Sequence, residues 1–164
     1  MPALLAVSAW LSRWVLHAAR LCLAALGIVV IYGVVLRYAF NNSPPYVEQL
    51  ALLLVISVAM FGAAAGVHDA GHIGLDSLVK TLPAPVQRGV AVVVELLIIT
   101  FALLLLAGSV LMSLSTYHDT IPTLGISEAF RYLAPVLASL LIALFAVTHL
   151  LALFARKTQG PAWN

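Results

Sequence analysis

A few ionisable residues lie inside or at the edge of long apolar segments, where charge is costly and often functional. Arg37 and Glu48 flank residues 41–45, which read NNSPP and form a strong turn signal. Two antiparallel helices joined by this turn would bring both side chains to the same level. Three interpretations stay open: an ion pair across the hairpin, a pair with a partner subunit, or an arginine that reaches the lipid headgroups alone.

Glu95 and His149 are the ionisable residues placed well within the third and fourth apolar segments. A proton or ion site is one interpretation of a carboxylate at this depth. Because one isolated carboxylate cannot form a relay, we favour a Glu95 that reaches the membrane interface or pairs with a basic partner on another chain. His149 stands alone, without a second histidine at matching depth, which argues against haem.

His68 and His72 are four residues apart, a spacing at which two histidines on one helix face can bind a metal ion. The glycines between and after them weaken such a helix, and no third histidine or cysteine is near, although Asp69 and Asp76 are. We therefore expect a structural loop with polar anchors. We expect no metal ion and no other cofactor in this chain.

Gly62 and Gly66 form a GxxxG motif within an apolar segment. Small residues at this spacing let helix backbones approach closely in a membrane, where hydrophobicity gives no drive for helices to associate. The motif predicts tight packing of the second helix, either within this chain or against a partner.

The elements that must position these residues are four apolar segments of 19 residues or more. An α-helix rises about 1.5 Å per residue, so each segment can cross a hydrocarbon core of about 30 Å. The composition agrees, because 63% of the 164 residues are hydrophobic and 9% are charged. We predict an all-α polytopic membrane protein with one membrane domain, residues 1–164. Its predicted spans are residues 21–40, 49–67, 89–117 and 134–154.

Lysine and arginine are distributed unevenly over the segments that connect these spans. Six of the eight lie in residues 1–20, 68–88 and 155–164. The other two are Arg37, at the border of residues 41–48, and Arg131, within residues 118–133. An excess of positive charge marks the cytoplasmic side. We therefore expect both termini to be cytoplasmic, residues 118–133 to be periplasmic, and residues 68–88 to be a cytoplasmic connection.

The first twenty residues have a basic stripe formed by Arg13, His17 and Arg20, together with Trp10 and Trp14 one turn apart. Two interpretations stay open: an amphipathic helix at the membrane interface, or a lead-in that extends the first span.

Several functional classes are excluded by what the sequence lacks. It has no Ser-His-Asp arrangement, phosphate-binding loop, dinucleotide-binding motif or paired catalytic carboxylates, so we do not expect an enzyme. The net charge of +2 is too small and too scattered for nucleic-acid binding. Cys22 is the single cysteine, which leaves no internal disulfide.

Short stretches then follow one another in an order typical of one membrane-protein family. They are LRYAFN at 36–41, YVEQLA at 46–51, FGAA at 61–64 and GHIGLD at 71–76, followed by Leu82, Pro83, Arg88, Pro122 and Pro135. In these features the chain resembles the small membrane subunit (Q-type, DctQ-like) of tripartite ATP-independent periplasmic transporters, known as TRAP transporters. The resemblance runs from about Arg37 to Phe154. Tyr46 is a departure, because the family usually has tryptophan there.

The resemblance implies a scaffold subunit in the bacterial inner membrane. In this family a large multi-span subunit carries the substrate, usually an organic acid, together with sodium ions. A soluble periplasmic binding protein delivers that substrate, and the small subunit braces the large one and helps to dock the binding protein. On this interpretation the residues expected at a subunit interface or in a structural role are Arg37, Glu48, Gly62, Gly66, His72, Asp76 and Glu95.

Two other functions compete with the scaffold interpretation. A membrane anchor of a respiratory complex would need paired histidines within the spans or a quinone pocket. A small stand-alone transporter would need several inward-facing polar groups. Glu95 alone gives little support for such a transporter.

Overall fold

Four long helices make up almost all of the computed structural model, which describes residues 2–42, 44–69 and 83–158. They are α1 (Pro2–Ala39), α2 (Pro45–Asp69), α4 (Ala84–Ser115) and α5 (Phe130–Thr158). Each contains a stretch long and apolar enough to cross a membrane. The predicted all-α fold with four spans is therefore confirmed. In a bilayer the backbone must satisfy its own hydrogen bonds, and long apolar helices are one of the two ways to do so.

The turn between α1 and α2 sets the position of the charged residues beside it. Pro45 begins α2, at a position where a helix needs no backbone donor. Asn41 adopts a positive φ of 49°, a conformation that asparagine tolerates better than most residues. Arg37 falls in the last turn of α1 and Glu48 in the first turn of α2, and each charge suits the dipole of its helix end.

Helix α1 is a single helix of 38 residues, which gives it a length of about 57 Å. The first twenty residues therefore continue the helix of the first span without a break. Their buried positions are Ser8, Ser12, Val15 and Ala19, which share one helix face. Trp10 and Trp14 are exposed on the other side of the helix. A position of this segment along the membrane surface stays a prediction.

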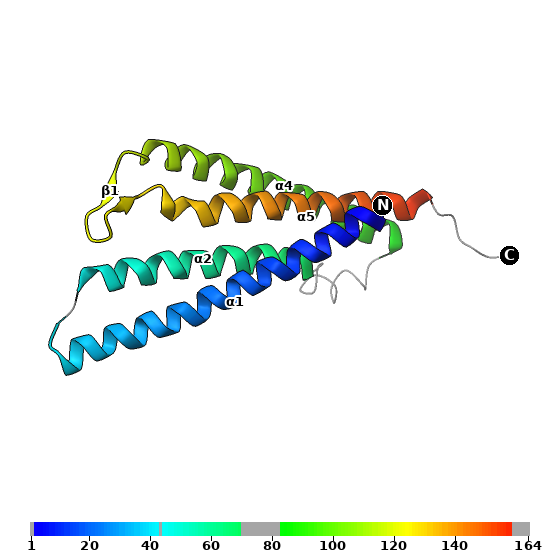
Figure 1. The fold of residues 1–164 in the computed structure, drawn as a ribbon. Helices are drawn as coiled ribbons and strands as arrows, with labels where there is room; N and C mark the ends of the chain where they lie inside the picture. Colours follow the sequence, from blue (N-terminus) through cyan, green and yellow to red (C-terminus); the bar gives the residue numbers. More distant parts are fainter. Residues whose placement is uncertain (1, 43, 70–82, 159–164) are drawn as a thin grey trace.

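The helices pack in the order α1, α2, α5, α4. The α1–α2 hairpin and the α4–α5 hairpin are joined mainly by α2 against α5, and α1 contacts α5 as well. In Figure 1 the beginning of α1 and the end of α5 lie at the same end of the bundle. An even number of spans requires this arrangement. Which side of the membrane that end faces stays a prediction.

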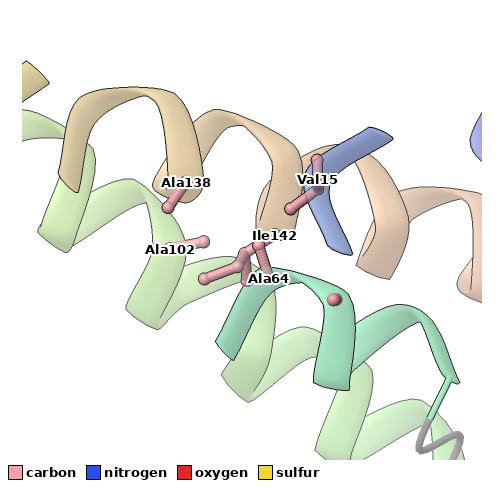
Figure 2. Packing of buried hydrophobic residues seen from close by; sticks show 6 residues of the cluster. Val15, Ala64, Ala102, Ala138 and Ile142 are labelled. Carbon is pink, nitrogen blue, oxygen red and sulfur yellow. The ribbon is translucent and has the colours of Figure 1, made fainter. Parts of the chain in front are cut away.

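The core lies where all four helices meet and is built largely from alanine. Its buried members are Val15, Ala64, Ala65, Ala102, Ala138 and Ile142. Figure 2 shows these short side chains between closely spaced backbones. Larger apolar side chains, such as Leu21, Ile28 and Leu104, are exposed on the outside of the bundle. Small residues inside and large ones outside are typical of helices that pack in lipid.

Helices α4 and α5 are joined by a small hairpin of two-residue strands, β1 (Thr120–Ile121) and β2 (Ile126–Ser127), paired antiparallel. Its turn is closed by the Gly125 amide, which donates to the Ile121 carbonyl at 2.9 Å, and Gly125 has a φ of 67° that suits glycine. The two strands are too short to have a sequence pattern of their own.

Candidate functional site

Two charged groups of side chains lie at different places in the bundle. We call Arg37 and Glu48 the hairpin pair. We call His68, Glu95 and His149 the buried cluster. The hairpin pair lies beside the α1–α2 turn, and the buried cluster lies between α2, α4 and α5. The two groups differ in how far each is enclosed by the chain, and that difference determines what each can do.

The hairpin pair is an ion pair between neighbouring helices. Arg37 Nη2 donates to Glu48 Oε1 at 3.1 Å. The side chains are 56% and 67% exposed. Of the three interpretations that the sequence left open, the ion pair across the turn is therefore the one present in the structure. Because both partners are exposed, the pair contributes little to stability and its charges can meet a ligand or another chain.

A groove lies beside the hairpin pair, with a cavity volume of about 280 Å³. Val30, Val34, Val47 and Ala51 form its apolar wall, and the hairpin pair also lines it. We call this feature the hairpin groove. Ligand pockets for whole small molecules begin at about 300 Å³, so the hairpin groove can hold a chain or a headgroup but not a large solute.

The buried cluster contains the most enclosed charge among the described side chains. Glu95 is 1% exposed, and its Oε1 lies 3.5 Å from Nδ1 of His149, which is 25% exposed. A buried carboxylate needs a polar partner, because leaving its charge unpaired in a low-dielectric interior costs several kcal/mol. The expectation that Glu95 reaches the interface or pairs with another chain is wrong, and so is the expectation that His149 stands alone. The contact joins α4 to α5.

His68 extends the buried cluster to α2. Its ring lies 5.0 Å from that of Phe145, edge to face, and 6.1 Å from that of His149, measured between ring centroids. His68 Nδ1 is also 2.9 Å from a carboxylate oxygen of Asp69. His68 thus lies at the end of α2 and packs on α5, so the cluster ties three helices together.

The glycines of the GxxxG motif do not pack inside this chain. Gly62 is exposed, and a Cβ built on either Gly62 or Gly66 would meet no atom within 4 Å. Ala64 and Ala65, between the two glycines, are the residues buried in the core. Packing within the bundle was one of two alternatives for the glycines, and the structure contradicts it. A partner contact stays a prediction.

The remaining predicted residues, His72 and Asp76, lie outside the described residues. Within the described ranges, no group of three His, Cys, Asp or Glu side chains is placed to hold a metal ion.

Arg131 is a structural residue that sequence reasoning missed. It donates to Glu128 at 2.8 Å and to Gln49 at 3.2 Å. The second bond links the start of α5 to the start of α2, so it bridges the two hairpins. The spacing of Glu128 and Arg131, three residues apart, could have indicated the first contact. Nothing in the local sequence points to the second.

These contacts describe a membrane bundle whose enclosed polar side chains find partners within the chain. Ser139 and Thr148, for example, are buried and donate to carbonyls of their own helix. Large apolar surfaces remain on the outside. The architecture is that of a multi-pass membrane protein.

Comparison with known proteins then gives the family. Residues 26–156 match the family model described as the DctQ component of tripartite ATP-independent periplasmic transporters. The chain belongs to this family, whose members are small permease subunits of transporters, not enzymes.

Individual relatives agree with that assignment. A Haemophilus influenzae protein named as a TRAP transporter small permease protein is 27% identical over 79% of this chain and 81% of its own length. The C4-dicarboxylate TRAP transporter small permease protein DctQ of Vibrio cholerae is 29% identical over 53% of this chain and 38% of its own. The sialic acid TRAP transporter permease protein SiaT of H. influenzae is 27% identical over 93% of this chain and 24% of its own.

Proposed function

We propose that this chain is the scaffold subunit of a sodium-gradient-driven TRAP transporter that takes up an organic acid. It braces a large multi-span transport subunit in the bacterial inner membrane and helps to dock a periplasmic substrate-binding protein. The sodium ions bind the large subunit, not this chain. Both termini are cytoplasmic, as the distribution of lysine and arginine favours.

The observation that carries the proposal is the match to the sialic acid permease. Nearly the whole chain, 93% of it, aligns with only 24% of that protein. A region similar to this chain is thus covalently joined to about three-quarters of a longer permease. Covalent fusion of two parts supports a lasting contact between the corresponding separate subunits.

The structure supports the same role through the way its polar groups are arranged. The buried cluster is enclosed by the chain, and Arg37 and Glu48 bond to each other across the α1–α2 turn. The outer faces of α1 and α4 present large apolar side chains such as Ile31, Phe101 and Leu111. A bracing subunit needs rigidity inside and apolar surface outside, and it needs no polar path for a solute.

The relatives' names suggest the substrate class. Two of them are named for C4-dicarboxylates and for sialic acid, both of which are carboxylates. We infer that the substrate of the complete transporter is also an organic acid.

The decisive experiment purifies this chain in mild detergent with its large subunit co-expressed, then reconstitutes the pair in vesicles with the binding protein. Uptake of a C4-dicarboxylate or sialic acid should require the large subunit, the binding protein and an inward sodium gradient. The small subunit alone should transport nothing. Uptake by this chain alone, or full uptake by the large subunit without it, would overturn the proposal.

Glu48→Ala separates assembly from substrate recognition. If this chain is a brace, the variant reduces the amount of assembled transporter and leaves the Kd of the binding protein for its substrate unchanged. A normal amount of complex with a changed substrate Kd would contradict this division of labour.

A further inference from the structure

The first half of α1 has two opposite faces. The buried residues between Ser8 and Ala19 form one of them, and Val15 joins the core of the bundle there. At about 100° per residue, five exposed aromatic and basic residues share an arc of about 120° on the other side. We call this arc the N-terminal basic face: Trp10, Arg13, Trp14, His17 and Arg20. Because the opposite side packs into the bundle, the N-terminal basic face points away from it.

The length of α1 places this face at the level of the lipid headgroups. Arg37 lies in the last turn of α1, and the beginning of α1 lies at the other end of the bundle (Figure 1). At about 1.5 Å per residue, Arg20 lies about 26 Å and Arg13 about 36 Å from Arg37 along the helix axis. A hydrocarbon core of about 30 Å that begins at Arg37 ends between these two arginines. Tryptophan is enriched at such a boundary, and Trp14 lies close to it.

The two arginines of the N-terminal basic face have charges that the described part of the chain does not neutralise. The chain has no acidic residue before Glu48. Within the described ranges, neither Arg13 nor Arg20 takes part in an ion pair. Asp69 ends the antiparallel helix α2 at this end of the bundle, and its carboxylate bonds to His68. An anion that approaches the face therefore meets two guanidinium groups whose donors are uncommitted.

The aromatic side chains form a strip beside the arginines. The rings of Trp10 and Trp14 lie 5.8 Å apart, edge to face, and those of Trp14 and His17 lie 6.5 Å apart. The two tryptophans are 59% and 60% exposed, so their apolar rings are available to lipid. An indole has an apolar body and one N–H donor, which suits the glycerol and ester region of a phospholipid.

The arginines favour a headgroup with a net negative charge. A guanidinium binds phosphate through two parallel N–H···O bonds. Side chains on a helix lean toward its N-terminus, so that of Arg20 reaches from the hydrocarbon boundary toward the level of Arg13. In a zwitterionic headgroup the ammonium or choline brings a positive charge close to both arginines and offsets much of the attraction to the phosphate.

We propose that the N-terminal basic face binds the headgroup of an anionic phospholipid, such as phosphatidylglycerol. The lipid phosphate contacts Arg13 and Arg20, and Trp10 and Trp14 lie against the glycerol region. The site depends on the level of this face in the bilayer. It does not depend on the substrate, on the large subunit or on which side of the membrane the face lies, so it can fail or hold independently of the proposed function.

Native mass spectrometry of the purified chain tests the proposal. The chain is incubated in detergent with equal amounts of phosphatidylglycerol and phosphatidylcholine, and the retained lipids are counted. Each arginine near lipid charge contributes about fivefold to anionic lipid binding, so the wild type should retain at least fivefold more phosphatidylglycerol. The double variant R13Q/R20Q should retain the two lipids almost equally. Both side chains are exposed, so the variant should fold, and circular dichroism checks this.

A matched control separates the site from general attraction between charges. The double variant R156Q/K157Q removes the same charge from the end of α5 and should keep the preference of the wild type. If R156Q/K157Q loses the preference as fully as R13Q/R20Q does, the net charge of the chain selects the lipid and the site is refuted.

The tryptophans are tested without any change of charge. The double variant W10L/W14L should lower phosphatidylglycerol retention severalfold. Phe154→Leu removes an exposed aromatic ring from α5 and should change nothing. Equal retention by W10L/W14L and the wild type would remove the tryptophans from the site.

Two further outcomes would overturn the lipid site. The first is equal retention of the two lipids by the wild type, or an unchanged preference in R13Q/R20Q. The second comes from a photo-crosslinker at position 17 of the full chain in the cell membrane, which should attach to phospholipid. If it attaches to another protein chain instead, the N-terminal basic face is a protein contact.

Discussion

The hairpin pair and the buried cluster use the same chemistry in opposite surroundings. Arg37 and Glu48 approach to 3.1 Å with more than half of each side chain exposed. Glu95 and His149 approach to 3.5 Å with Glu95 almost completely enclosed. The shorter contact is the weaker one, because exposed charges are already solvated and their attraction is screened. Burial, more than distance, determines which contact holds the bundle together.

This comparison divides the molecule into two functional regions. The buried cluster links three helices near the core and fixes their arrangement. The hairpin pair lies at an edge, where it can exchange partners without unfolding the chain. A brace needs both properties, since it must be rigid internally and must attach to something else. The predictions below test this division, beginning with the largest effect.

His149→Leu should lower the free energy of unfolding by about 3 kcal/mol, because it removes one partner of a buried carboxylate. Glu95 has a further interaction, so the loss falls at the lower end of the usual range for broken buried pairs. Thermal unfolding of the chain in detergent measures the effect.

The double variant E95L/H149L is the control for this effect. Two apolar residues replace a buried pair at little cost, so the double variant should be more stable than H149L alone. A double variant less stable than H149L would show that the carboxylate's other contact, not the His149 pair, dominates the cluster.

Ala65→Leu should destabilise the isolated chain by about 1–3 kcal/mol, because Ala65 is 2% exposed in a closely packed core. Gly62→Leu is the matched substitution at an exposed position of α2 and should leave the stability of the isolated chain unchanged, since its Cβ meets no atom. Under the proposed function it should reduce co-purification with the large subunit. If Gly62→Leu and the wild type co-purify equally with the large subunit, the large subunit does not contact this chain at Gly62.

Gly33→Ala should destabilise the α1–α2 hairpin by about 1 kcal/mol, because the new Cβ would lie 2.8 Å from Val47 Cγ1. Gly27→Ala, also in α1, meets nothing within 4 Å and should be neutral or slightly stabilising. The double variant G33A/V47A removes the clash and should recover part of the loss, as measured by thermal unfolding. If G33A is as stable as G27A, the two helices are free to separate at this point.

The helices were predictable from the sequence for a physical reason, and the hairpin pair was one of three interpretations that the sequence allowed. A bilayer permits few backbone solutions, so long apolar segments predict helices directly. The turn at residues 41–45 brings Arg37 and Glu48 to the same level, which made their pairing one of the interpretations. Local patterns are sufficient where the contact itself is local.

The buried cluster was not predicted, because it depends on how far each helix is rotated about its axis. Glu95 and His149 are distant in sequence and meet only because α4 and α5 turn those faces toward each other. The same rotation places Ala64 and Ala65 inside and Gly62 outside, which the GxxxG spacing alone cannot reveal. One available signal was depth, since both ionisable residues lie near the same end of neighbouring antiparallel segments.

The smallest expected effect concerns the hairpin pair itself. A double-mutant cycle with Arg37→Gln and Glu48→Gln should give a coupling energy of about 0.2–1 kcal/mol, because both side chains are exposed. Adding salt should reduce this coupling, since exposed charges are screened. The coupling between Glu95 and His149, measured in the same way, should be several times larger and insensitive to salt. If the coupling energy of Arg37 and Glu48 is as large as that of Glu95 and His149, lipid or detergent encloses the hairpin pair in the folded protein. The two regions would then differ in what surrounds them, not in whether they are buried.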